Sequence, residues 1–164
     1  MVRWRAVGLL VIGLVLVIAG CSTPRRTITG SEAIQRLDDY LRQAVDAAPS
    51  GLRVVREKAE ATYGGGCTRG LSDSDFTGQV EAEVNYEVSD VPPDVAAQYL
   101  DALARLWKLK WGPADRSRDR VDVQIDEGKF RLYGVYSSGA RRVGVGGTSG
   151  CIWVNGTPGP NDKP

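Results

Sequence analysis

Three cysteines carry the most definite chemistry in this 164-residue chain, and the first of them, Cys21, follows a distinctive tripeptide. Ile18, Ala19 and Gly20 place an aliphatic residue and two small residues ahead of the thiol, as in a bacterial lipobox. In that chemistry a diacylglycerol is attached to the thiol and the chain is cut before the cysteine. The new amino group then usually receives an acyl chain such as palmitate. The sequence therefore predicts lipidation at Cys21.

The residues before Cys21 fit a leader that directs export. Arg3 and Arg5 are the only charged residues there, and residues 6–20 form an uncharged apolar run. A membrane-spanning helix needs about 20 apolar residues, whereas a positive start and a shorter apolar run are typical of a secretory signal. We expect a signal peptide over residues 1–20. The mature domain would then be lipid-anchored at the extracytoplasmic face of the cell membrane, because two or three acyl chains anchor firmly.

Cys67 and Cys151 remain as an even pair once Cys21 is lipidated. In an oxidising compartment such a pair favours a disulfide bond, which here would close a loop of 84 residues. A redox role is not favoured, because the sequence has neither a CxxC motif nor a histidine to lower a thiol pKa. We predict a structural disulfide between these two residues.

The absence of histidine excludes several classes of active site. No serine or cysteine triad that uses histidine can form, and no histidine-ligated zinc or copper site. Acid pairs such as Asp122 and Asp126 remain open to glycosidase chemistry, and Asp73 with Asp75 to calcium binding. The glycine-rich stretch 144–151 lacks the lysine of a phosphate-binding loop. We interpret these residues as solvated strand and loop positions, and expect no catalytic residue, metal or cofactor.

Aromatic and basic residues alternate near the end of the second expected helix. Trp107 belongs to the apolar stripe, whereas Lys108, Lys110 and Trp111 form a candidate partner contact. Removing the two arginines of the leader leaves 19 basic against 20 acidic residues, a net charge near −1. That balance gives no electrostatic reason to expect nucleic-acid binding.

Periodicity predicts two amphipathic helices and several strands. Ser31 is the expected N-cap of the first helix, which ends near Pro49, and Asp94 begins the second, which ends near Trp111. The clearest strand is 80–88, where apolar and acidic residues alternate. Further strands are expected at 52–58, 121–125, 130–136 and 141–145, with a final edge segment at 151–154.

This pattern predicts an α+β two-layer sandwich, with two helices on one face of an antiparallel sheet of about five strands. The expected organisation is a signal peptide over 1–20, a lipidated tether over 21–30, a single domain over 31–155 and a flexible tail over 156–164.

Several stretches resemble the LppA-type lipoproteins of mycobacteria and related actinobacteria. They are the lipobox, AAPSG at 47–51, WGP at 111–113, EGKFRLYGV at 127–135 and SGCIWV at 149–154. The resemblance implies a cell-envelope lipoprotein without known catalysis. It supplies no catalytic residues.

We therefore expect a non-enzymatic domain that binds a partner, such as an envelope protein, at the membrane. The alternatives are a small carrier of a lipid or other apolar ligand and a hydrolase that uses carboxylates. The carrier requires an apolar cavity, and the hydrolase requires acids that converge in a cleft with raised pKa values.

Overall fold

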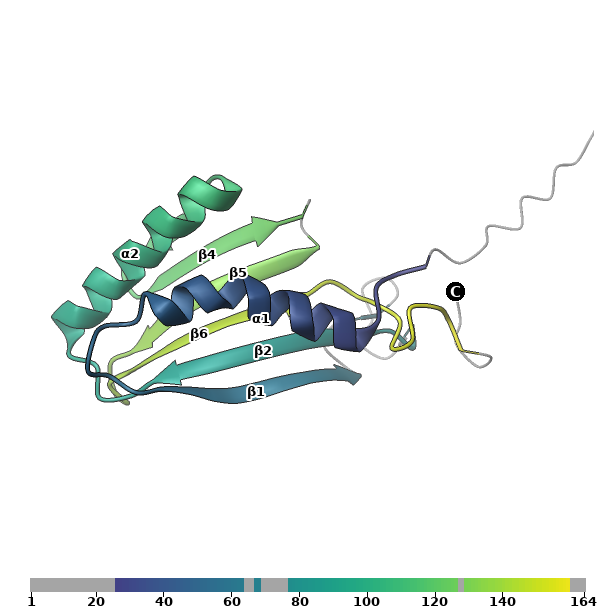
Figure 1. Ribbon diagram of the computed structural model, residues 1–164, viewed down its shortest axis with the longest axis horizontal. Helices are drawn as coiled ribbons and strands as arrows, with labels where there is room; N and C mark the ends of the chain where they lie inside the picture. Colours follow the sequence, from purple (N-terminus) through teal and green to yellow (C-terminus); the bar gives the residue numbers. More distant parts are fainter. Residues whose placement is uncertain (1–25, 64–66, 69–76, 127–128, 160–164) are drawn as a thin grey trace, which may run out of the picture.

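The structure is a computed structural model that describes residues 26–63, 67–68, 77–126 and 129–159. In chain order it contains α1 (Gly30–Asp46), β1 (Val54–Tyr63), β2 (Val80–Val88), α2 (Pro93–Trp111), β3 (Asp115–Ser117), β4 (Arg120–Ile125), β5 (Phe130–Ser137) and β6 (Arg142–Ser149) (Figure 1).

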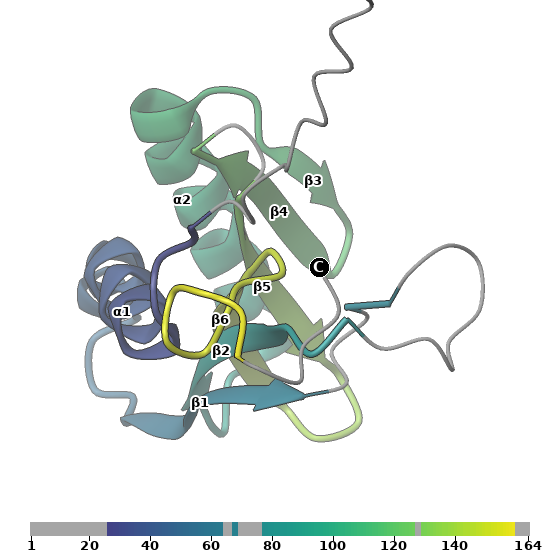
Figure 2. The same cartoon turned by 90° about the vertical axis from the view of Figure 1, so that its right-hand side faces the viewer.

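All six strands form one antiparallel sheet in the order β1-β2-β6-β5-β4-β3. The last four strands form a meander, and its final strand β6 pairs with β2 in the middle of the sheet. Both helices lie on the same side of the sheet (Figure 2). The predicted two-layer α+β architecture is therefore confirmed, with one strand more than the five expected.

The core fills the space between the helices and the sheet. Leu37 and Leu41 of α1, and Leu103 and Trp107 of α2, are fully buried. Each helix approaches the sheet above a glycine, because a side chain there would collide with helix leucines. A Cβ on Gly147 would lie 2.9 Å from Leu37 Cδ2 of α1, and a Cβ on Gly134 would lie 3.1 Å from Leu100 and Leu103 of α2.

The first helix begins earlier than predicted. Thr29, not Ser31, is its N-cap, and the Thr29 hydroxyl accepts a hydrogen bond from the backbone N–H of Glu32. The Glu32 carboxylate in turn accepts from the backbone N–H of Thr29 at 2.7 Å, which completes a capping box. This reciprocal pair explains why Thr29 is the cap, since Glu32 lies three residues after Thr29, as a capping box requires, but directly follows Ser31.

Three strand predictions need correction. β1 continues to Tyr63, and β6 continues through the glycine-rich stretch to Ser149, where the sequence was interpreted as a loop. The short strand β3 was not expected. The predicted edge segment 151–154 is not a strand and contributes a single bridge, between Ile152 and Val80.

The folded domain extends beyond both predicted boundaries. The backbone N–H of Thr27 donates to the carbonyl of Gly156 at 2.9 Å, and the N–H of Trp153 donates to the Thr27 hydroxyl at 2.8 Å. Residues 27–30 therefore belong to the domain and not to a tether, and Gly156 belongs to a closing turn. Neither helix in the described part of the chain has the length and apolarity of a membrane span.

Candidate functional site

No helix or strand of the described residues covers the sheet face opposite α1 and α2, which we call the uncovered face, and this face carries an ordered row of polar side chains. Glu83 on β2 accepts from Lys58 on β1 at 2.6 Å and from the Asn85 amide at 2.7 Å. The Tyr133 hydroxyl on β5 donates to Asn85 Oδ1 at 2.5 Å and also lies 3.2 Å from Glu83. These contacts cross β6 because Gly146 faces them, and a Cβ at that position would collide with Asn85 and Tyr133.

The row continues across β4 and β5. Asp122 accepts from Arg131 Nε at 2.8 Å and from Nε and Nη2 of Arg120, the latter at 2.9 Å. The Arg120 guanidinium also lies 5.8 Å from the centre of the Tyr133 ring, within cation–π range. A polar network, which we call the outer-face network, therefore joins Lys58 to Arg131 across five intervening residues.

The charges of the outer-face network are fixed by their partners. Burial tends to raise the pKa of Glu83 and Asp122, but hydrogen bonds and positive charge from Lys58, Arg120 and Arg131 outweigh it, so both pKa values lie below the usual range. Burial, followed by the negative charge of Glu83, raises the pKa of Tyr133 to about 12. At neutral pH the two acids are ionised and the phenol keeps its proton. This arrangement presents fixed donors and acceptors rather than a group ready to transfer a proton.

A groove of about 410 Å³ lies beside this network on the uncovered face. Gly144 of β6 forms its floor, and a Cβ there would meet no atom within 4 Å. Asn85 and Glu87 of β2 stand on one side, and Tyr133 and Val135 of β5 stand on the other. Arg142 closes one end through an ion pair with Glu87 at 3.0 Å. The groove therefore combines an aromatic wall, a small floor and one charged end.

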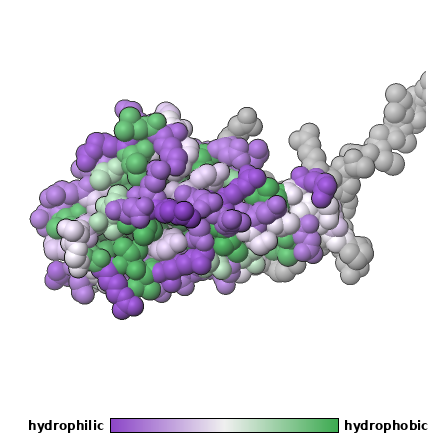
Figure 3. Space-filling model, viewed as in Figure 1, coloured by the Kyte–Doolittle hydropathy of each residue, from purple (hydrophilic) through white to green (hydrophobic). Residues whose placement is uncertain are grey.

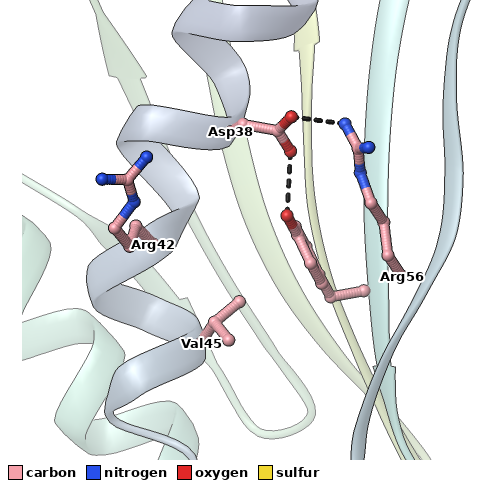
Figure 4. Close-up of a pocket in the computed structure, with 5 residues that line it drawn as sticks. Asp38, Arg42, Val45 and Arg56 are labelled. Atoms are coloured by element: carbon pink, nitrogen blue, oxygen red, sulfur yellow. Dashed lines mark hydrogen bonds and ion pairs between the residues drawn. The ribbon is translucent and has the colours of Figure 1, made fainter.

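A smaller hollow of about 240 Å³ lies on the other face, between α1 and β1 (Figure 4). There Asp38 points from α1 toward the sheet and binds Arg56 together with the Tyr86 hydroxyl, which donates at 2.8 Å. Burial and then this carboxylate raise the pKa of Tyr86. Because Asp38 has both partners, this cluster fastens the helix to the sheet edge and offers less to a ligand than the groove does.

The sequence-predicted partner contact is only partly exposed. Trp111 is half-buried and packs edge-on against Tyr40 of α1, with ring centroids 5.8 Å apart, and Lys110 Nζ lies 4.7 Å from the Trp111 ring. Lys108 and Lys110 are exposed, and Leu109 between them is 89% exposed. On the helix face, apolar residues form separate patches among hydrophilic ones (Figure 3).

Other candidate residues do not converge. Asp122 lies on the solvated strand face as predicted, held by two arginines, and Asp126 lies at an exposed turn with a φ of 52°. The calcium candidates Asp73 and Asp75, and the lipidation residue Cys21, lie outside the described residues.

Cys67 and Cys151 lie at disulfide distance, with Cα atoms 5.6 Å apart, so the predicted pairing is confirmed. The bond joins the segment between β1 and β2 to the segment after β6. The disulfide therefore links the half of the sheet that contains β1 and β2 covalently to the C-terminal segment of the chain.

Sequence reasoning missed the groove. Asn85 and Tyr133 are 48 positions apart and meet only because β6 lies between β2 and β5. The available signal was the row of polar residues alternating with apolar ones in each strand, which placed them on one face without giving the strand order.

Comparisons with protein-family models, with curated proteins and with solved structures find no match for this chain.

Proposed function

We propose that the protein is a lipid-anchored, extracytoplasmic envelope protein that binds a polar partner without catalysis, through the groove on the uncovered sheet face. The groove floored by Gly144 carries the proposal, since an open floor beside an aromatic wall and a charged end is the kind of concave surface that recognises ligands. The lipobox at 18–21, the resemblance to LppA-type lipoproteins and the cysteine pair support the location.

The chemistry of the groove favours a partner with hydroxyl or amide groups. Asn85 offers an amide, Glu87 and Arg142 offer a carboxylate and a guanidinium, and Tyr133 offers a ring. The ionised, paired acids support binding rather than hydrolysis. The buried leucines and Trp107 occupy the space between the layers, which favours binding at the surface over an apolar ligand carried inside.

Site-directed photocrosslinking in the native envelope tests this proposal. A photoreactive side chain at Val135 lies in the groove, one at Gln98 lies on the exposed side of α2, and one at Leu109 tests the contact predicted from the sequence. We expect a discrete adduct from position 135 that disappears in a Gly144→Leu variant, because the new side chain fills open space in the groove without touching the core.

An adduct at position 135 that persists in Gly144→Leu would refute the groove as the site. An adduct at position 109 alone would move the site to the end of α2. Lipidation is tested separately by mass analysis of the mature chain, in which Cys21→Ala should abolish the acylated amino-terminal peptide.

A further inference from the structure

A further cavity, of about 380 Å³, lies at the end of the domain where the described chain begins. Its apolar lining includes Ile28, Phe130 and Ile152, and its charged lining includes Arg26, Arg36 and Lys129. The volume lies within the range of small-ligand sites. This cavity is distinct from the groove, which lies on the opposite face of the sheet.

The charges around this cavity favour an anion. Asp126 is the acid among its lining residues, and it pairs with Lys129 at 3.6 Å. Within the described part of the chain, Arg26 and Arg36 have no ion-pair partner. Among the residues that line the cavity, three cations against one acid give a net charge of about +2 above an apolar floor. The Glu32 carboxylate lies near two of these cations, and its pKa is lowered by hydrogen bonds from Thr29 and then by the charges of Arg36 and Arg26. An anion that carries apolar groups fits such a surface better than either a simple ion or a neutral lipid.

The position of the cavity relative to the proposed lipid anchor indicates that the anion comes from the membrane. Arg26 follows Cys21 by five positions, so the connection reaches at most about 17 Å. The hydrogen bonds from Thr27 to Gly156 and from Trp153 to Thr27 hold the first described residues against the domain. A membrane that holds Cys21 therefore lies within about two Debye lengths of the arginines at physiological salt.

We propose that this cavity holds the headgroup of an anionic phospholipid from the membrane to which the domain is anchored. Arg26 and Arg36 contact the phosphodiester, while Ile28 and Phe130 contact the glycerol and the first acyl carbons. The proposal rests on the lipid anchor of the proposed function, but the binding itself does not require the anchor.

The test uses the chain that starts at Ser22, which lacks Cys21 and keeps every described helix and strand with its core. Its binding to phosphatidylcholine vesicles with and without phosphatidylglycerol is measured by co-sedimentation. We expect binding only with phosphatidylglycerol. Arg26→Gln combined with Arg36→Gln should weaken it about thirty-fold, since each basic residue near an anionic surface contributes about five-fold.

Two further variants separate the cavity from general electrostatic attraction. Arg53→Gln with Arg105→Gln removes the same charge from exposed arginines outside the cavity and should have little effect. Gly150→Leu keeps every charge but places a side chain in the cavity, where a Cβ meets only the Lys129 carbonyl at 3.6 Å, and should abolish the preference for phosphatidylglycerol. Thermal midpoints verify that each variant is folded.

Equal weakening by the two arginine pairs would overturn the proposal, as would unchanged binding of Gly150→Leu. Free inorganic phosphate that releases the protein from the vesicles, at a concentration equal to that of the phosphatidylglycerol present, would indicate a site for free anions and would also overturn the proposal. None of these outcomes depends on lipidation or on the groove. If the headgroup proposal fails, the proposed function is still tested independently by the mass analysis of Cys21 and by the crosslinks at position 135.

Discussion

Replacing Gly147 by alanine should destabilise the domain by forcing α1 away from the sheet. A Cβ at this position would lie 2.7 Å from Leu132 Cδ2, 2.9 Å from Leu37 Cδ2 and 3.2 Å from the Arg131 carbonyl. Both leucines are fully buried, so neither side chain can turn toward solvent to make room. The added methyl group must therefore move the helix or push the leucines out of their preferred rotamers.

The size of the effect follows from two opposing contributions. Overpacking of a well-packed core typically costs about 1–3 kcal/mol. Replacing a strand glycine by alanine recovers roughly 0.5–1 kcal/mol of chain entropy where space is available. Gly144→Ala on the same strand receives only the second contribution, because its Cβ meets no atom within 4 Å. The difference between the two variants therefore isolates the steric contribution, which we place at about 2 kcal/mol.

Urea unfolding followed by tryptophan fluorescence measures this difference, with the Cys67–Cys151 pair oxidised in every sample. Gly144→Ala should match or exceed the parent chain, whereas Gly147→Ala should unfold at lower urea, and its thermal midpoint should lie roughly 8 °C below that of Gly144→Ala. Adding Leu37→Ala should reduce the penalty of Gly147→Ala, because the colliding methyl group is removed. Equal stability of the two glycine variants would refute the close approach of α1 to β6.

Three other predictions concern the bonds that hold the domain together. Reducing Cys67–Cys151 should lower the unfolding free energy by about 4.5 kcal/mol in the chain-entropy model of an 84-residue loop, measured by urea unfolding with and without reductant; a loss below about 1 kcal/mol would contradict it. Thr29→Ala should lower stability by about 1 kcal/mol through loss of the capping box, and Ser31→Ala should be nearly neutral in the same thermal assay. The pKa of Asp122 is lower in the folded protein, so the stability that this carboxylate contributes is present above its unfolded pKa and is lost as the pH falls through the folded value. Asp122→Asn should therefore lower the unfolding free energy at pH 7 and have little effect at pH 2, as measured by urea titration. An equal loss at both pH values would count against the ion pairs.

Much of the fold was predictable because it follows from local periodicity. The alternation in 80–88 placed both ends of β2, and the apolar stripe ending at Trp111 placed α2 to within a residue. The start of α1 was misplaced although its signal was present, since Thr29 and Glu32 have the spacing of a capping box and Ser31 does not.

The glycine-rich half of β6 was not predictable from propensity, because glycine weakens a strand and usually marks a turn. The structure explains two of these glycines by neighbours distant in sequence: Gly147 lies under Leu37 of α1, and Gly146 lies under the contact between Asn85 and Tyr133. These requirements arise only once β6 is placed between β2 and β5. The groove could not be predicted from the sequence for the same reason, since its walls come from strands that are not adjacent in the chain.

The two proposed sites lie along a single strand, which would give the domain a direction relative to the membrane if Cys21 is lipidated as proposed. Gly144 forms the groove floor, and Ser149, five positions further along β6, lines the cavity near the first described residues, so about 17 Å separates them. A short flexible connection raises the effective concentration of a second contact to the millimolar range. A headgroup affinity of only about 1 mM would therefore keep the cavity occupied once Cys21 is anchored. Tether and headgroup together would then fix the domain with the cavity at the membrane and the groove on the part of β6 farther from it, where a partner in the envelope can reach it.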